Sequence, residues 1–131
     1  MSAFQDKSSM FQKAANESNG LTYYAAVGHS AYFCCFLLVE HIWHYSMSKD
    51  ENDLTSLCKK KSAGIHETLI NEIRSYIKEI SITDSNLIYD WLTQLKILRV
   101  KADYKDEVFG ADKANRSLSI MKSLIPLLSK Y

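Results

Sequence analysis

Apolar residues recur at every third or fourth position along most of this chain, which is the period of a helix that buries one face. The pattern predicts five helical segments, over residues 3–17, 21–47, 62–80, 85–104 and 111–129. Asn19-Gly20 is a helix stop after the first segment, and Ser85 is a favourable N-cap for the fourth. Pro126 is expected to kink or end the last helix.

The rest of the pattern favours a purely helical domain. Residues 80–82 alternate between apolar and polar, but this run is too short for a strand. The polar stretch 48–61 predicts a loop, interrupted at most by one short helical turn. A chain of 131 residues with only 1 Pro and 4 Gly is not typical of a turn-rich β-sandwich. We therefore expect a single all-α domain over residues 1–131, an up-and-down bundle of four to five helices.

The second segment is the most apolar part of the chain. Its apolar run, residues 31–39, is followed at once by Glu40, His41 and His44. A membrane span needs about 20 predominantly apolar residues, so we expect a helix buried on most sides and no membrane association. The small residues of this segment would let another helix approach closely; they are Ala25, Ala26, Gly28, Ser30 and Ala31.

The cysteines indicate a reducing compartment. Cys34 and Cys35 are adjacent, Cys58 is distant, and no metal-binding spacing such as C-x-x-C is present. Adjacent cysteines cannot easily form a disulfide with each other. The N-terminal residues carry no apolar signal segment. We expect buried structural cysteines in a cytoplasmic protein.

The charges of the chain nearly balance, with 16 Lys+Arg against 15 Asp+Glu and a formal net charge of +1. Bulk charge therefore does not indicate a nucleic-acid or membrane partner. Local basic groups remain, namely the lysine run 59–61 and the pair Lys101 and Lys105. We interpret the run as solvated surface, with phosphate contact as the alternative.

Arg99 and Asp103 are the first candidates for chemistry, because they continue an apolar stripe through Trp91 and Leu95. At this spacing of four residues, a guanidinium and a carboxylate can pair on one helix face. A charged pair on a stripe that faces the core must be sheltered by a cleft, a subunit interface or a partner. Two interpretations remain open here, a structural ion pair and a functional arginine.

A metal site is the competing chemistry. Glu40, His41 and His44 lie on one helix, and helices of di-iron bundles present such groups. However, the order E-H-I-W-H differs from H-E-x-x-H, and no second helix offers Glu-x-x-His. His29 and His66 are isolated in the sequence. We expect no metal and no cofactor, and keep a metal-dependent bundle enzyme as a third interpretation.

Two segments resemble the HEPN family, the higher-eukaryote and prokaryote nucleotide-binding domain. The segment L-K-I-L-R-V-K-A-D-Y, residues 95–104, resembles the LR-x-x-ADY signature near the end of that domain. A short loop and a helix of the A-x-x-x-L-x-x-M kind follow, from Ala114 to Met121. Upstream, L-T-Y-Y-A-A-V-G-H-S-A-Y-F, residues 21–33, is similar to the family's helix of aromatic and small residues. The order of elements matches as well, so the resemblance spans nearly the whole chain.

The resemblance implies a bundle that dimerises through its long helices and has a minimal nucleotidyltransferase as its partner. Many such pairs are toxin–antitoxin systems, in which the HEPN protein is a metal-independent ribonuclease. Active members have a histidine four to six residues after an arginine; the histidine is the acid/base and the arginine stabilises the phosphate. Arg99 matches that arginine, but Asp103 follows it and the last histidine of the chain is His66. His29, from the facing helix or from a second subunit, is the candidate replacement.

These observations predict an HEPN-like module that binds a nucleotide, RNA or a nucleotidyltransferase partner without efficient catalysis. The expected binding residues are Arg99, Lys101, Asp103, Tyr104 and Lys105. The alternative is a metal-independent endoribonuclease toxin that uses Arg99, with His29 as its acid/base. A structural dimer without a ligand is the remaining interpretation. We also expect a homodimer, joined through the aromatic and small-residue face of the second helix.

Overall fold

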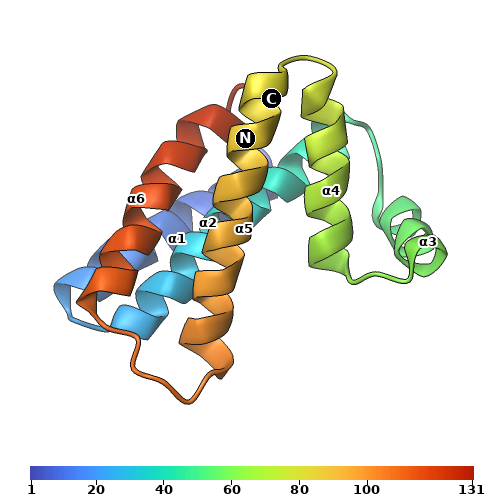
Figure 1. The fold of residues 1–131 in the computed structure, drawn as a ribbon. Coiled ribbons are helices and arrows are strands. Elements are labelled where there is room, and N and C mark those ends of the chain that lie inside the picture. Colours follow the sequence, from blue (N-terminus) through green and yellow to red (C-terminus); the bar gives the residue numbers. More distant parts are fainter.

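The computed structural model describes residues 1–131 and contains six α-helices and no strand (Figure 1). The helices are α1 (Ala3–Gly20), α2 (Tyr24–His41), α3 (Glu51–Lys61), α4 (Ile65–Lys78), α5 (Ile82–Tyr104) and α6 (Ala111–Leu128), and a π-helical turn, η1 (Ile42–Ser46), continues α2. The predicted all-α bundle is confirmed, with more helices than the four to five expected. Consecutive long helices reverse direction, so that α4 runs up, α5 down and α6 up again in Figure 1.

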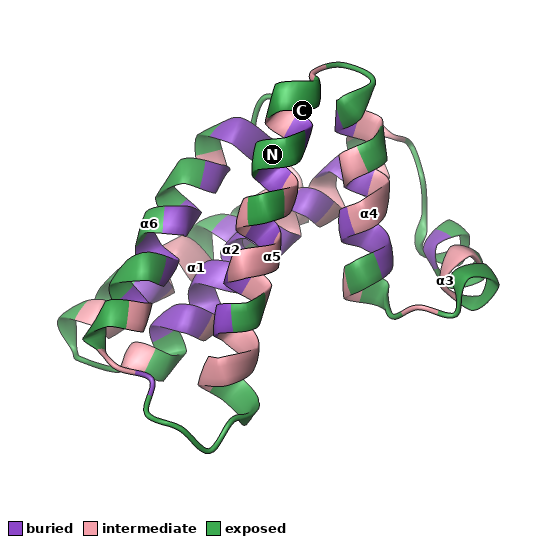
Figure 2. Cartoon of the chain, in the orientation of Figure 1, coloured by how far each residue is buried: buried purple, intermediate pink, exposed green.

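Helix α2 lies at the centre of the bundle and packs against α1, α5 and α6. Figure 2 shows buried residues along α2 and on the sides of its neighbours that face it. The segment Tyr24–Ser46 is long and apolar enough to cross a membrane by length and composition, with a mean hydropathy of 1.3. However, 61% of this window is buried inside the bundle, which confirms the prediction of a helix buried on most sides.

The two adjacent cysteines belong to this buried helix. Cys34 and Cys35 are both fully buried, as predicted, and Cys58 is half-buried on α3. Burial raises the pKa of the Cys35 thiol well above its ordinary value. The Ser8 hydroxyl donates a hydrogen bond to the Cys34 carbonyl oxygen at 2.7 Å, which ties α1 to α2.

The prediction of a loop over residues 48–61 is wrong, because residues Glu51–Lys61 form helix α3. Asp50 caps this helix: its carboxylate accepts from the Asp53 backbone N–H at 2.8 Å, and Asp53 accepts from the Asp50 N–H at 2.9 Å. The lysine run 59–61 lies in the last turn, where positive charge stabilises a helix. Only Leu54 is buried, so this helix lacks the apolar periodicity from which the other helices are predicted. Helix α3 lies at the side of the bundle, against α4 (Figure 1).

Helix α5 has the buried face predicted from its periodicity, but it begins earlier than expected. Ile88, Leu92, Leu95 and Leu98 are buried. The N-cap is Ser81, whose hydroxyl accepts from the Asp84 backbone N–H at 3.2 Å, and not Ser85. Ser85 is fully buried and donates its hydroxyl hydrogen to the Arg74 carbonyl oxygen of α4 at 2.8 Å.

The last helix contains Pro126 but ends within the same turn, at Leu128. A proline lacks the backbone N–H of a helical hydrogen bond, and at this position that loss affects only the last turn of the helix. The C-terminal Tyr131 then packs back, accepting from the Ser46 hydroxyl through its carbonyl oxygen and donating from its own hydroxyl to Asp84. These bonds fasten the chain end to η1 and to the start of α5.

Gly28 allows the close approach of α2 to α5 and to the loop before α6. A Cβ atom at Gly28 would lie 2.7 Å from Cζ of Phe109 and 3.0 Å from Cβ of Ala102. Such contacts are shorter than van der Waals packing permits. The small residues predicted to permit close packing divide accordingly: Gly28, Ser30 and Ala31 are buried, while Ala25 and Ala26 are exposed.

We expect Gly28→Ala to lower the free energy of unfolding by about 1–3 kcal/mol, because the added methyl group overpacks this contact. Urea unfolding followed by circular dichroism measures the change. Gly20→Ala is the control, since a Cβ at Gly20 meets nothing within 4 Å and alanine favours the helix. Equal stability of the two variants would show that the Gly28 contact relaxes without strain.

Candidate functional site

One carboxylate oxygen of Asp103 contacts two other candidate residues, Arg99 and His29. Asp103 Oδ2 accepts a hydrogen bond from Arg99 Nε at 2.9 Å, and the same oxygen lies 2.8 Å from His29 Nδ1. Arg99 and Asp103 come from the last turns of α5, and His29 comes from the facing helix α2. The Tyr104 hydroxyl accepts a further bond from Arg99 Nη2 at 3.2 Å. We call these four residues the Arg99 cluster.

The cluster lies in a half-sheltered environment with aromatic walls. The side chains of Arg99 and Asp103 are 15% and 19% exposed, and that of His29 is 42% exposed. The guanidinium carbon of Arg99 lies over the rings of Phe33, at 5.0 Å from the centroid, and Tyr104, at 5.2 Å. These separations permit cation–π attraction, which is stronger where the cation is partly desolvated. The rings therefore hold the guanidinium in place in addition to the ion pair.

The hydrogen-bond pattern leaves groups of the cluster free for a ligand. Arg99 uses Nε and Nη2 within the chain, and Nη1 makes no hydrogen bond. His29 uses Nδ1, and its Nε2 makes none. Asp103 orients both side chains, in the way that a carboxylate fixes the ring of a histidine in catalytic and metal sites. The free Nη1 edge of the guanidinium suits a phosphate oxygen, whereas Nε2 of neutral His29 is an acceptor that suits a hydroxyl hydrogen.

Not all of the predicted binding residues belong to the cluster. Lys101 lies on another face of α5, because a residue two positions from Arg99 points away from it on a helix, and Lys105 is the first residue after that helix. With Lys96, Ile97 and Val100 they line a shallow hollow of about 370 Å³. None of these three lysines forms an ion pair within the chain. The predicted set of five therefore divides into Arg99, Asp103 and Tyr104 on one side and the two lysines on the other.

A second histidine, His66, lies beside the cluster, and no spacing in the sequence relates it to Arg99. The Tyr32 hydroxyl and His66 Nδ1 lie 2.7 Å apart, although 34 positions separate them in the chain. The imidazole of His66 stacks on Phe36 with ring centroids 4.2 Å apart. Burial lowers the pKa of His66, and the positive charges of Arg99 and Lys96 lower it further. Arg99 lies over the Tyr32 ring as well, at 5.7 Å, so this pair borders the guanidinium.

The three residues considered for a metal are not brought together. His41 Nδ1 forms a hydrogen bond of 2.7 Å with the Ser2 hydroxyl, and His44 stacks on Phe4 with centroids 4.9 Å apart. No three His, Cys, Asp or Glu side chains gather in a position to hold a metal ion. The metal-dependent interpretation therefore has no geometric support.

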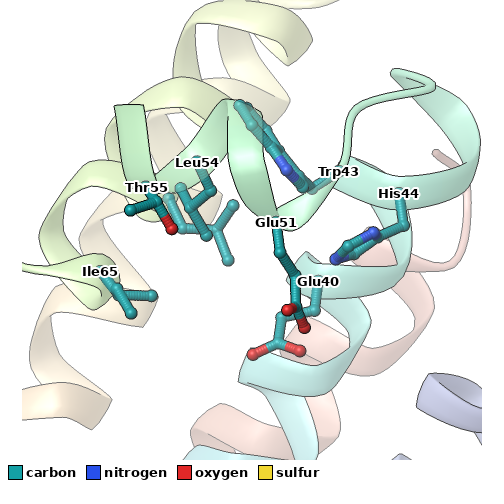
Figure 3. Close-up of a pocket in the computed structure, with 8 residues that line it drawn as sticks. Glu40, Trp43, His44, Glu51, Leu54, Thr55 and Ile65 are labelled. Atoms are coloured by element: carbon teal, nitrogen blue, oxygen red, sulfur yellow. The ribbon is translucent and has the colours of Figure 1, made fainter. Parts of the chain in front are cut away.

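Glu40 instead lines a cavity of about 230 Å³ between η1, α3 and α4. Figure 3 shows its carboxylate close to that of Glu51 from α3, with the His44 ring beside them. Burial raises the pKa of Glu40; the negative charge of Glu51 raises it further, against the opposing effect of His44. Neither carboxylate forms an ion pair within the chain.

The face proposed for dimerisation is largely used inside the chain. The aromatic and small-residue side of α2 packs against α5, α6 and Phe109, so that Gly28, Ala31 and Tyr32 are buried. Tyr23, at the start of the helix, keeps 62% of its surface exposed. A homodimer through this helix remains a prediction, and the residues of the face that stay exposed are Tyr23, Ala25 and Ala26.

Comparison with known proteins identifies no relative: no family model, no curated protein and no solved structure matches this chain.

We expect Glu40→Gln to raise the free energy of unfolding at neutral pH, because the folded protein must otherwise hold a half-buried carboxylate charged beside Glu51. A raised pKa in the folded state means that the Glu40 contribution to stability is favourable at low pH. That contribution falls as the pH rises from the ordinary glutamate range through the raised value. Urea unfolding of both proteins across this range measures the difference.

The free energies of unfolding of the parent and of the Glu40→Gln variant are expected to converge at acid pH and to diverge at higher pH. Glu79→Gln, at an exposed position at the end of α4, is the control and should leave the pH dependence unchanged. A Glu40→Gln variant that is less stable than the parent at neutral pH would contradict the interpretation.

Proposed function

We propose that this chain is an HEPN-like helical module that binds RNA through the phosphate at the Arg99 cluster. The observation that carries the proposal is the shared carboxylate oxygen of Asp103, which fixes Arg99 and His29 next to each other. Both side chains then have one nitrogen free. A guanidinium held in this way loses little rotational freedom when it binds a phosphate.

The aromatic surroundings support RNA as the ligand class. Tyr104 is 69% exposed and lies next to the guanidinium, so its ring is available to stack on a nucleobase. Unpaired bases of single-stranded RNA are recognised in this way, by stacking on aromatic and arginine side chains. The small net charge of the chain fits a local contact with one or two phosphates and does not favour wrapping of a long duplex.

The resemblance adds a second partner to the proposal. A minimal nucleotidyltransferase would be the protein that binds this module in the cytoplasm. The hollow with the unpaired Lys96, Lys101 and Lys105 on α5 supports a surface for a partner with acidic groups. Lys101 of this surface points away from Arg99, whereas Lys96 lies close enough to His66 for its charge to lower the pKa of that histidine.

We expect Arg99→Ala to weaken RNA binding at least about tenfold, since one hydrogen bond to a charged group contributes about 1.5–3 kcal/mol. Fluorescence anisotropy with a single-stranded 2′-O-methyl RNA oligonucleotide in EDTA measures binding without cleavage. Arg116→Ala is the matched control: Arg116 is an exposed arginine on α6 that bonds to Gln94. Equal affinity of the Arg99→Ala variant and the parent would overturn the proposal.

A second candidate function is favoured by the position of His29. The sequence-based hypothesis needs an imidazole near Arg99, and His29 reaches the same carboxylate oxygen as Arg99. With Nδ1–H donated to Asp103, His29 Nε2 is placed to take the proton of an RNA 2′-hydroxyl while Arg99 stabilises the phosphate. This arrangement would support metal-independent endoribonuclease activity, as in the toxin alternative.

In that case His29→Ala should lower the rate of RNA cleavage in EDTA by about 100-fold or more, the usual contribution of a general base. The measurement is gel analysis of an unmodified RNA oligonucleotide, with Arg99→Ala beside it and His41→Ala as a control away from the cluster. Absence of cleavage by the parent protein, under conditions in which a control ribonuclease is active, would leave RNA binding alone.

A further inference from the structure

Tyr32 and His66 form a hydrogen-bonded pair outside the Arg99 cluster. Both residues border Arg99: its guanidinium carbon lies 5.7 Å from the centroid of the Tyr32 ring, and its positive charge acts on His66. Phe33 is near all three groups: its ring centroid lies 4.9 Å from that of His29, 6.1 Å from that of His66 and 5.0 Å from the guanidinium carbon of Arg99. The two histidines and the arginine are thus arranged around one ring.

The burial of Tyr32 decides the direction of its hydrogen bond to His66. Tyr32 is fully buried, and its hydroxyl oxygen makes no hydrogen bond other than the 2.7 Å contact with His66 Nδ1. A buried hydroxyl hydrogen without an acceptor is strongly unfavourable, so the hydroxyl donates and Nδ1 accepts. Burial raises the pKa of Tyr32, which keeps this donor protonated. The hydrogen of neutral His66 is therefore on Nε2.

The surroundings also keep His66 neutral. Its ring is packed against Phe36, and the positive charges of Arg99 and Lys96 oppose protonation. Neither Asp103 nor Glu67 forms a hydrogen bond with His66. Asp103 is engaged by Arg99 and His29, and Glu67, the neighbour of His66 in the first turn of α4, is exposed. A neutral imidazole with a fixed Nε2–H is a hydrogen-bond donor toward an anion, and Nε2 makes no bond within the chain.

We infer that His66 is a phosphate-contacting residue, held by Tyr32 with its hydrogen on Nε2, and that together with Arg99 it completes an anion site beside His29. The inference rests on the proposed function, because it adds a second hydrogen-bond donor, beside Arg99, to the same site. His66 also lies in the first turn of α4, whose N-cap Gly64 provides no side-chain bond. The positive end of that helix dipole further favours an anion at this position.

The test uses a variant that keeps the ring and removes only the donor. His66→Phe preserves stacking on Phe36 and should weaken binding of the 2′-O-methyl RNA oligonucleotide about tenfold, the effect of losing one hydrogen bond to a charged group. Tyr32→Phe leaves the tautomer unfixed and should weaken binding by a smaller factor. His44→Phe is the matched control, because His44 is another half-buried imidazole stacked on a phenylalanine. Urea unfolding confirms that each variant is folded.

A spectroscopic readout separates a donor from a merely structural residue. Long-range ¹H–¹⁵N correlation spectra of the parent protein should show the hydrogen of His66 on Nε2, and the Nε2 resonance should shift on addition of the RNA oligonucleotide. A hydrogen on Nδ1 would overturn the inference. So would RNA binding that depends on Arg99 but leaves His66→Phe at parental affinity and the His66 resonances unmoved, although the proposed function would then survive. Absence of any Arg99-dependent binding would overturn both.

Discussion

The burial of α2 is the constraint on which the rest of this structure depends. A helix that is apolar on nearly all sides must be covered on all sides, because the hydrophobic effect scales with the apolar area left in water. Helices α1, α5 and α6 provide that cover. The remaining helix pair, α3 and α4, packs on the outside, with α4 against α5. The order of elements along the chain follows from this arrangement, since short connections favour neighbours that run antiparallel.

The same packing positions the Arg99 cluster. Gly28 lets the backbone of α2 approach Ala102 of α5, and the next residue on each helix is His29 and Asp103. The close approach of Gly28 to Ala102 therefore places the imidazole of His29 within hydrogen-bond distance of the Asp103 carboxylate. Arg99 joins them because it lies one helical turn before Asp103 on the same face. The geometry of the Arg99 cluster therefore depends on the close packing of α2 against α5.

The parts of the structure that the sequence could predict are those that depend on local spacing. The buried faces of α5 and α6 follow from their periodicity, and the Arg99–Asp103 pair follows from a separation of four residues. Helix α3 was missed because its stability comes from the Asp50 cap and from charge, with little apolar periodicity. Lys101 is close to Arg99 in sequence, but the helix turns it away, and Lys105 lies just beyond the end of α5.

Contacts between distant segments were harder to predict. The sequence offered His29 as a hypothesis, since a facing helix could bring it to Arg99, and the structure places it at the same carboxylate. The pairing of Tyr32 with His66 had no such signal, because no rule of spacing relates residues on α2 and α4. His29 and His66 share an environment because the Phe33 ring lies near both of them.

The attachment of α3 has a consequence for the motions of the molecule. This helix packs against α4 alone, contributes one buried residue, Leu54, and is tied to η1 by the bond from Trp43 Nε1 to the Asp50 carbonyl oxygen. Segments with so little buried apolar surface detach at a lower free energy than the global unfolding of a domain. Because α3 forms one wall of the cavity at Glu40, its detachment would expose that cavity to solvent while α2 and the Arg99 cluster stay folded.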